Sequence, residues 1–335
     1  MQKFKPSLTV ILMVLLIAPF SLKAQEKFSG VVFGEYYYML SNHNPGIEGM
    51  NGFWFRRLYF TYDHKFGSRF KIRVRFEANS RGDFSTKEKI VPYVKDLYIQ
   101  WSKNGQSIII GISPTPTFSK VEKFWGYRAV EKTPLDLYKM AHSRDTGIAF
   151  KGELARKRVH YHFMFANGEG NKSEFNKQKK IMGAIGIYPS KKIYVEFYSD
   201  FEKGPVGSTN VYTLQGFIGF TTAKFTLGAL YSSQVHQMDE EENLNLRVLS
   251  LTARYTINEK FTVLGRYDRM MDPLPYGPEI SYLPLDSVSP FNLFIAGIDY
   301  RVNKNFSIIP NVEFVRYDEL DTSDLMGKLT FSYKW

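Results

Sequence analysis

Two histidines, His160 and His162, are separated by a single residue in a segment where polar and apolar residues alternate. In an extended strand, residues with this spacing project from the same face, so the pair could supply two nitrogen ligands to a zinc ion. A zinc site needs at least one further protein ligand, and the sequence indicates none. We therefore expect both side chains to be polar residues of a strand face, and we predict no metal and no cofactor.

The run His142-Ser143-Arg144-Asp145 contains the residue types of a hydrolase. Direct neighbours in a sequence cannot form a catalytic triad, because its members must meet in space from separate positions. The sequence has no Gly-x-Ser-x-Gly elbow, no nucleotide-binding loop and no dinucleotide fingerprint. It also contains no cysteine, which excludes a thiol nucleophile. We therefore predict that the protein is not an enzyme.

Basic residues suggest a different chemistry. In the segment 71–79, Lys71, Arg73 and Arg75 alternate with apolar residues, so one face of this strand is ionic and the other apolar. Arginine can hold a phosphate or a carboxylate through two parallel hydrogen bonds. A row of such side chains would attract anions, provided that the fold places them around a space that solutes can enter.

The alternation recurs almost to the last residue and predicts about 16 strands. We place these strands near 27–40, 52–66, 69–79, 94–102, 106–112, 144–152, 156–166, 180–189, 191–201, 209–221, 223–234, 245–257, 259–270, 290–302, 304–317 and 324–335. Short turns such as Asn104-Gly105 alternate with mostly longer polar connections throughout. This order is typical of a closed outer-membrane β-barrel with both termini in the periplasm, and a soluble sandwich has no reason to maintain it.

Composition supports a membrane barrel. Aromatic residues make up 16% of the chain, with 28 Phe and 22 Tyr, and membrane barrels use such rings at the two edges of their apolar band. Formal net charge is +11, or +8 without the three lysines of residues 1–24. We expect the basic excess to serve anionic solutes or lipopolysaccharide in the outer membrane, and no nucleic acid.

Residues 1–24 have the pattern of a secretory signal peptide. Lys3 and Lys5 precede an uncharged run from Leu8 to Phe20, which is too short to cross a bilayer as a helix. We expect cleavage after Ala24, so that residues 25–335 form the barrel.

Side chains alternate between the two faces of a strand, so a charged residue at the positions between the apolar ones should face the interior. We call this rule parity. The expected cations are Arg57, Lys71, Arg73, Arg75, Lys151, Arg158, Lys192, Arg254, Arg266, Arg301 and Lys328. The expected anions are Asp63, Glu77, Asp96, Glu196, Asp268, Asp299 and Glu313. Mutual pairing with a cationic remainder would favour the passage of anions.

The longest connection, 113–143, is the third of the long class and carries many apolar groups. Such groups must pack against something, and a loop folded into the barrel would form a constriction. The constriction residues would then be Lys120, Lys123, Trp125, Tyr127 and Arg128. A cap packed on the barrel rim is the alternative.

Over this loop and over residues 52–79, the chain resembles the porins related to the phosphate-selective porin O and P family. The resemblance implies a 16-stranded barrel that is commonly trimeric, with an inward third loop and an interior tuned to anions. In that family, selectivity depends on a ladder of arginines and a cluster of lysines, whose positions cannot be matched here one by one.

The sequence therefore predicts an outer-membrane porin for passive diffusion of small hydrophilic solutes, anionic and phosphate-like in character, and a possible homotrimer. An outer-membrane barrel enzyme of the lipase or protease type is one alternative. A structural or adhesin barrel with an occluded interior is the other.

Overall fold

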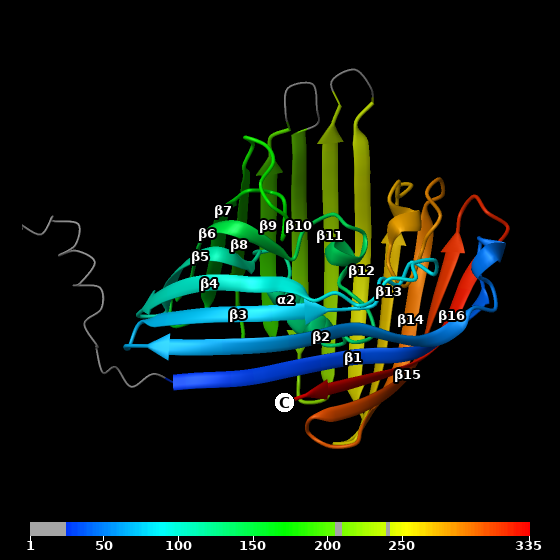
Figure 1. The fold of residues 1–335 in the computed structure, drawn as a ribbon, viewed down its shortest axis with the longest axis horizontal. Helices are drawn as coiled ribbons and strands as arrows, with labels where there is room; N and C mark the ends of the chain where they lie inside the picture. The colour runs from blue at the N-terminus through cyan, green and yellow to red at the C-terminus, as the bar shows by residue number, and fades with distance from the viewer. Residues whose placement is uncertain (1–24, 205–209, 239–241) are drawn as a thin grey trace, which may run out of the picture.

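A computed structural model describes residues 25–204, 210–238 and 242–335. Each strand pairs antiparallel with the next along the chain, and β1 pairs with β16, so the sheet closes into a ring (Figure 1). The strands are β1 Gln25–Ser41, β2 Asn51–Phe66, β3 Phe70–Ala78, β4 Tyr93–Lys103, β5 Gln106–Pro114, β6 Arg144–Leu154, β7 Val159–Ala166, β8 Lys180–Ile187, β9 Ile193–Glu202, β10 Asn210–Thr221, β11 Phe225–Gln237, β12 Leu244–Thr256, β13 Phe261–Met270, β14 Phe291–Arg301, β15 Phe306–Tyr317 and β16 Ser323–Lys334.

The predicted closed antiparallel barrel of 16 strands is confirmed. The predicted signal peptide, residues 1–24, lies outside the described residues. The main difference in strand bounds is at β7, which begins at Val159 rather than at 156, because Ala155, Arg156 and Lys157 adopt positive φ angles in a turn.

The two faces of the sheet differ as the alternation requires. In β9, Glu196, Tyr198 and Asp200 point into the barrel and are buried, whereas Val195 and Phe197 lie on the outer surface and are exposed. The same arrangement on most strands gives the barrel an apolar outer surface. No helix in the described part of the chain has the length and apolar character needed to cross a membrane.

The connections differ between the two ends of the barrel. At one end, here called the short-turn end, they contain two to five residues. The tightest of these is Asn104-Gly105, where both residues have positive φ angles (51° and 77°), as a two-residue hairpin turn requires. At the opposite long-loop end, the longest connection spans residues 115–143.

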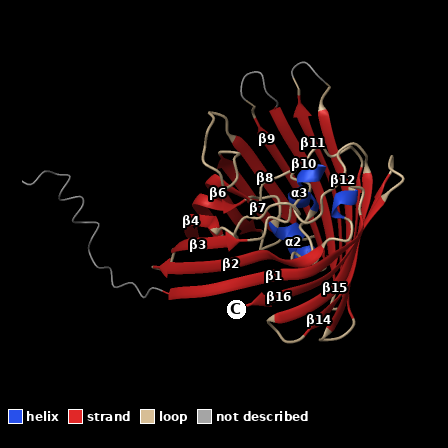
Figure 2. Ribbon diagram, turned by 45° about the vertical axis from the view of Figure 1, so that its right-hand side comes forward, coloured by secondary structure: helices blue, strands red, loops and turns tan. Residues whose placement is uncertain are grey.

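Two short helices of that longest connection lie inside the ring of strands (Figure 2). They are α2 Ser119–Trp125 and α3 Pro134–Leu137. The buried residues of α2 are Val121, Phe124 and Trp125, whose spacing places them on one side of the helix, and α2 contacts β11 and β12. Two 3-10 turns, η1 Pro45–Ile47 and η2 Gly277–Glu279, belong to other long connections.

The ring closes between the two ends of the described chain. Gly30 and Trp335 exchange two backbone hydrogen bonds of 3.1 Å, one in each direction. A Cβ atom at Gly30 would lie 1.8 Å from the Trp335 ring, and one at Gly34 would lie 2.2 Å from the Phe331 ring. Glycine at both positions therefore lets the aromatic rings of β16 lie directly on the backbone of β1.

Candidate functional site

Two β-bulges increase the charge on the inward face of β2–β4. The register between β1 and β2 shifts at Arg56, and the register between β3 and β4 shifts at Lys95. A bulge places two consecutive residues opposite one partner, which breaks the strict alternation of sides. Arg56 and Arg57 are consequently both buried in the interior, and so are Lys95 and Asp96.

Three carboxylates on this wall each lie between two cations. Glu77 accepts from Arg57 Nε at 2.6 Å and lies 2.9 Å from Lys95 Nζ. Asp96 contacts Arg75 at 3.2 Å and also binds Arg144, which begins β6. A third group is described next. Together the three groups contain six cations and three carboxylates, and we call them the cationic wall.

The third group contains Asp63, Lys71 and Arg73. Arg73 donates two hydrogen bonds of 2.7 Å to Asp63, one to each oxygen, and Lys71 Nζ is 3.1 Å from the same carboxylate. With every group ionised, six cations against three carboxylates leave three uncompensated positive charges. On this wall the cations therefore outnumber the carboxylates that they contact.

Access to the wall increases toward the short-turn end. Arg57 and Glu77 are buried, whereas the side chains of Lys71, Arg73 and Arg75 are 23%, 21% and 19% exposed. Solutes in the interior would therefore meet Lys71, Arg73 and Arg75 rather than Arg57.

The remaining predicted interior cations are in different environments. Lys151 on β6 is half-buried, and Arg254 on β12 donates to the backbone oxygen of Lys123 at 3.5 Å. Arg266 is fully buried and paired with Asp268. Arg301, at the end of β14, is exposed and lines the 700 Å³ cavity described below. Arg158 and Lys192 are exposed within short turns, so these two do not line the interior.

The connection 115–143 is hydrogen-bonded to inward-facing residues around much of the ring. Tyr127 donates to Asp299 on β14 at 3.1 Å, and Tyr138 donates to Asp268 on β13 at 2.7 Å. Gln215 on β10 donates to the backbone oxygen of Thr117. These contacts, with others from β2, β11, β12 and β16, place the segment within the barrel.

The predicted loop residues divide into packing and polar groups. Trp125 is 1% exposed and donates from Nε1 to the Glu131 backbone oxygen at 2.8 Å. Lys120 and Lys123 are half-buried and exposed, respectively. Arg128 contacts both Glu122, at 3.0 Å, and Asp136, at 2.6 Å. Burial alone would raise the pKa of Asp136, but Arg128 and Lys132 outweigh it and lower that pKa to about 2.

A buried network of five charges fixes the middle of this segment. Arg56 contacts Glu131 at 2.8 Å and Glu35 at 3.5 Å. Lys328 on β16 pairs with Glu313 on β15 and also donates to the Val130 backbone oxygen at 3.3 Å. All five side chains are almost completely removed from solvent. Loss of one partner would therefore leave an unpaired charge, which is costly in such surroundings.

The inward face of β11–β15 carries a cluster of apolar side chains beside its polar and charged residues, unlike the cationic wall. Leu230, Leu246, Leu264, Leu293 and Ile309 are buried there, each at 3% exposure or less. They form one hydrophobic cluster with Trp125, Leu135, Leu137 and Tyr138 of the segment 115–143. We call this face the apolar wall. This part of the interior thus resembles the core of a soluble protein.

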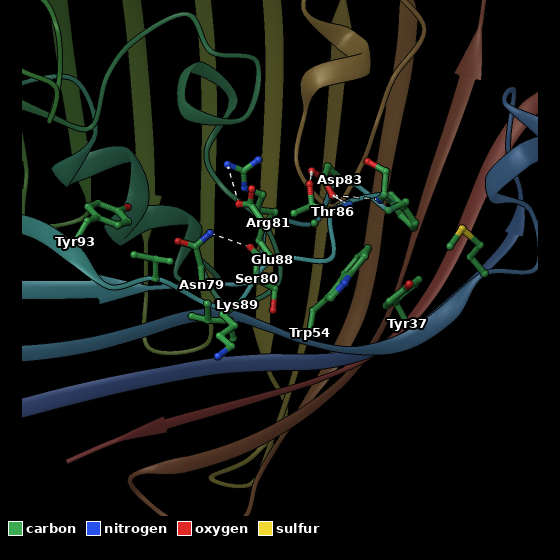
Figure 3. A pocket seen from close by; sticks show the side chains of 16 residues that line it. Tyr37, Trp54, Asn79, Ser80, Arg81, Asp83, Thr86, Glu88, Lys89 and Tyr93 are labelled. Carbon is green, nitrogen blue, oxygen red and sulfur yellow. Dashed lines mark hydrogen bonds and ion pairs between the residues drawn. The ribbon is translucent and has the colours of Figure 1, made fainter.

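Cavities lie at both ends of the barrel. One of about 590 Å³ at the long-loop end is lined by Tyr37, Trp54 and residues 79–91, with the Trp54 ring stacked on Tyr37 at 3.7 Å (Figure 3). Two others, of about 700 Å³ and 330 Å³, lie at the short-turn end. The 700 Å³ cavity includes Tyr127, Arg128 and Arg254 in its lining.

The other sequence candidates have structural roles. Arg144 binds Asp96, and Asp145 accepts backbone N–H groups of Thr146 and Gly168 at 2.7 and 3.0 Å. His160 and His162 line the 330 Å³ cavity. Within the described ranges, no group of three or more His, Asp or Glu residues has the geometry to hold a metal ion.

Parity reasoning missed Lys95 and Arg144 on the cationic wall and Arg56 in the buried charge network. The adjacent pair Arg56-Arg57 interrupts an alternating strand, which could have indicated a bulge. Parity also missed the apolar wall, although segments such as 291–298 carry apolar residues at both odd and even positions. A strand with that pattern is covered on both faces.

Searches against protein-family profiles and against curated proteins find no match. Solved structures do match. An anion-selective porin from Comamonas acidovorans has 11% identity and a TM-score of 0.71, over 93% of this chain and 100% of that one. OmpF of Salmonella typhi, in complex with daunomycin, has 12% identity and a TM-score of 0.66, over 92% and 97%. A trimer form of OmpT, an outer membrane protein of Vibrio cholerae, has 11% identity and a TM-score of 0.65, over 93% and 99%. The chain therefore has the barrel fold of these porins and outer-membrane proteins.

Proposed function

We propose that this protein is an outer-membrane porin through which small hydrophilic anions, including phosphate-like ones, diffuse passively. The observation that carries the proposal is the cationic wall, in which six cations share three carboxylates. Fixed positive charge in a narrow space with low-dielectric walls raises the local concentration of anions. The fold similarity to an anion-selective porin supports the same function.

The accessible arginines also suit tetrahedral oxyanions. Arg73 and Arg75 lie on the same strand two residues apart, and each already binds a carboxylate oxygen in the structure. Phosphate oxygens, like these carboxylate oxygens, accept hydrogen bonds from guanidinium groups. Because each guanidinium is partly engaged, binding would be weak, and weak sites in series are what conduction needs.

Planar-bilayer recording tests this function directly. We expect the purified protein to form channels whose reversal potential in a KCl gradient shows a mild preference for chloride. The preference should decrease at 1 M salt, where the screening length falls to about 3 Å. Replacement of Arg73 and Arg75 together by serine should shift the reversal potential toward cations.

The matched control removes two charges from an exposed turn instead. Arg156 and Lys157 lie between β6 and β7 and are exposed, so replacing both by serine should leave selectivity unchanged. A wild-type channel that prefers potassium, or an R73S/R75S variant with the wild-type reversal potential, would contradict the proposal.

The packing of residues 115–143 favours a second candidate, a structural barrel with an occluded interior. This segment covers the apolar wall, and its charged network is fully buried. A purified, folded protein without measurable conductance would support that candidate and exclude a porin.

The proposed location requires export. We propose that residues 1–24 are removed and that the short-turn end, with both termini, faces the periplasm in contact with outer-membrane lipid outside the ring. N-terminal sequencing of protein from outer-membrane fractions should begin near Gln25, and recovery of Met1 would contradict cleavage. We also propose a homotrimer, in line with the trimer form of the similar Vibrio protein, which native mass spectrometry can check.

A further inference from the structure

The cavity of about 330 Å³ at the short-turn end differs in charge from the cationic wall. It lies between the inward faces of β5–β9 and the start of α2, with Pro116 before the helix and Ser119 and Lys120 in its first turn. Its ionisable lining consists of Lys120, Lys151, Glu153 and Glu196, together with His160 and His162. Two ammonium groups thus face two carboxylates, so a simple anion gains no net attraction here.

Two of these charges have no partner of opposite sign. Lys151 and Glu196 form no ion pair with any other described residue, although both line the cavity. Glu196 is 6% exposed, and Tyr194 donates to its Oε2 atom. Its Oε1 atom is buried and has no hydrogen-bond partner among the described residues. A buried carboxylate oxygen without a donor is costly, so this atom points to a missing cationic or hydrogen-bonding group.

The register separates the two unpaired charges along the wall. Lys151 lies opposite His162 on β7, and His162 lies opposite Ala184 on β8. Glu196 on β9 is three strands from β6, which corresponds to about 14 Å between backbones. Between them the cavity surface carries His162 on β7 and the small side chain of Ala184 on β8. His162 Nε2, buried without a partner, adds a hydrogen-bonding atom beside Lys151.

Lys120 lies on the same side of the cavity as Glu196 but forms no ion pair with it in the described structure. Its Nζ atom lies 5.3 Å from the ring centre of Tyr194 and 5.4 Å from that of Tyr188, a cation–π arrangement. Glu153 lies 3.5 Å from His160. Glu196 therefore remains available for a cation that enters the cavity, and Lys151 remains available for an anionic group.

We propose that this cavity binds a small zwitterion of amino-acid or dipeptide size. The carboxylate of the ligand would contact Lys151 and His162, and its ammonium group would contact Glu196. This inference rests on the proposed porin function and adds to it a class of solute, one that carries both charges. The site differs from the cationic wall, which selects for negative charge alone.

Glycylglycine, with two derivatives, provides the test. N-acetylglycylglycine lacks the ammonium group, and glycylglycine amide lacks the carboxylate. Saturation-transfer NMR titrations of the full-length protein in detergent give the dissociation constants. We expect glycylglycine to bind at least about tenfold more tightly than either derivative, because each charged hydrogen bond contributes about 1.5 kcal/mol or more.

Two variants assign the two ends of the ligand. Glu196→Gln should weaken glycylglycine about tenfold and leave N-acetylglycylglycine unaffected, whereas Lys151→Met should weaken glycylglycine and leave glycylglycine amide unaffected. A general loss of structure would weaken all three ligands equally. Lys191→Met, at an exposed position in the β8–β9 turn, is the control and should change none of the constants.

Equal binding of the three compounds would overturn this inference, because the cavity would not distinguish the two charges. Absence of binding by all three would also overturn it, because the cavity would then hold water only. The readout does not depend on conduction. A protein that binds glycylglycine as expected but forms no channel would leave the zwitterion site standing and overturn the porin function. A selective channel that does not bind glycylglycine would do the reverse.

Discussion

The cationic wall and the apolar wall belong to one continuous sheet, yet the first presents ion-paired side chains to the interior and the second presents a cluster of buried apolar ones. On β2–β4, charged residues alternate with outward apolar residues and remain partly accessible. On β11–β15, apolar residues occupy both faces, and the segment 115–143 covers the inward one. The difference shows that a strand in a barrel can face a solvated space or a packed core, depending on what the connecting segments bring to it.

The largest effect should follow from removing the main packing group of the covering segment. Trp125→Ala deletes a side chain that is 1% exposed and breaks its hydrogen bond to Glu131. Such truncations cost about 3–5 kcal/mol, so residues 115–143 should leave the apolar wall more often. Limited trypsin proteolysis should then cut within the segment, and channel conductance should increase. Trp125→Phe retains most of the packing and should remain resistant. Unchanged proteolysis of the alanine variant would show that Trp125 does not hold the segment.

A loss of stability of similar size, which a second substitution should largely recover, is expected in the buried charge network. Arg56→Ala leaves Glu131 without its closest cation, at a cost of about 3–5 kcal/mol. A double variant, Arg56→Met with Glu131→Leu, replaces the pair by apolar groups of similar size and should recover most of that loss. Urea unfolding followed by circular dichroism compares the variants. If the double variant were no more stable than Arg56→Ala, charge pairing would not explain the loss.

A smaller effect is expected on the cationic wall. Asp63→Asn removes the shared partner of Lys71 and Arg73, whose side chains are partly exposed. Pairs with this exposure contribute about 0–1 kcal/mol, so stability should hardly change. The reversal potential should shift further toward chloride, since one more positive charge is uncompensated. A shift toward potassium would show that this face does not control selectivity.

The smallest effect should occur at the exposed pair between Lys139 and Glu279, which are 2.7 Å apart. Lys139→Ala breaks this contact between two long connections without uncovering the apolar wall. An exposed pair contributes at most about 1 kcal/mol, so proteolysis, stability and conductance should all match the wild type. Release of residues 115–143 in this variant would mean that the surface contact matters more than the packing beneath it.

The sequence was sufficient to predict the strands, because the side chains of a strand alternate between its two faces with a period of two residues. The barrel, its strand count and most of the cationic wall followed from that pattern. Arg56 and Lys95 did not, because a bulge depends on the pairing of two strands and not on one strand alone. The apolar wall was missed for a similar reason: Leu264 and Ile309 face a segment that is distant in sequence. Arg158 was assigned inward because parity continues past the point where β7 begins.

The seam between β1 and β16 has a consequence for how the molecule forms. The pairing of Gly30 with Trp335 joins residues from opposite ends of the chain, so contact order at the seam is as high as the topology permits. Until that pairing forms, both edge strands present unpaired backbone groups, and each such group costs several kcal/mol in hydrocarbon. A half-built ring therefore has no stable place within a bilayer. For the proposed outer-membrane location, insertion and ring closure must therefore proceed as one coupled event, which can begin only when β16 is available to pair with β1.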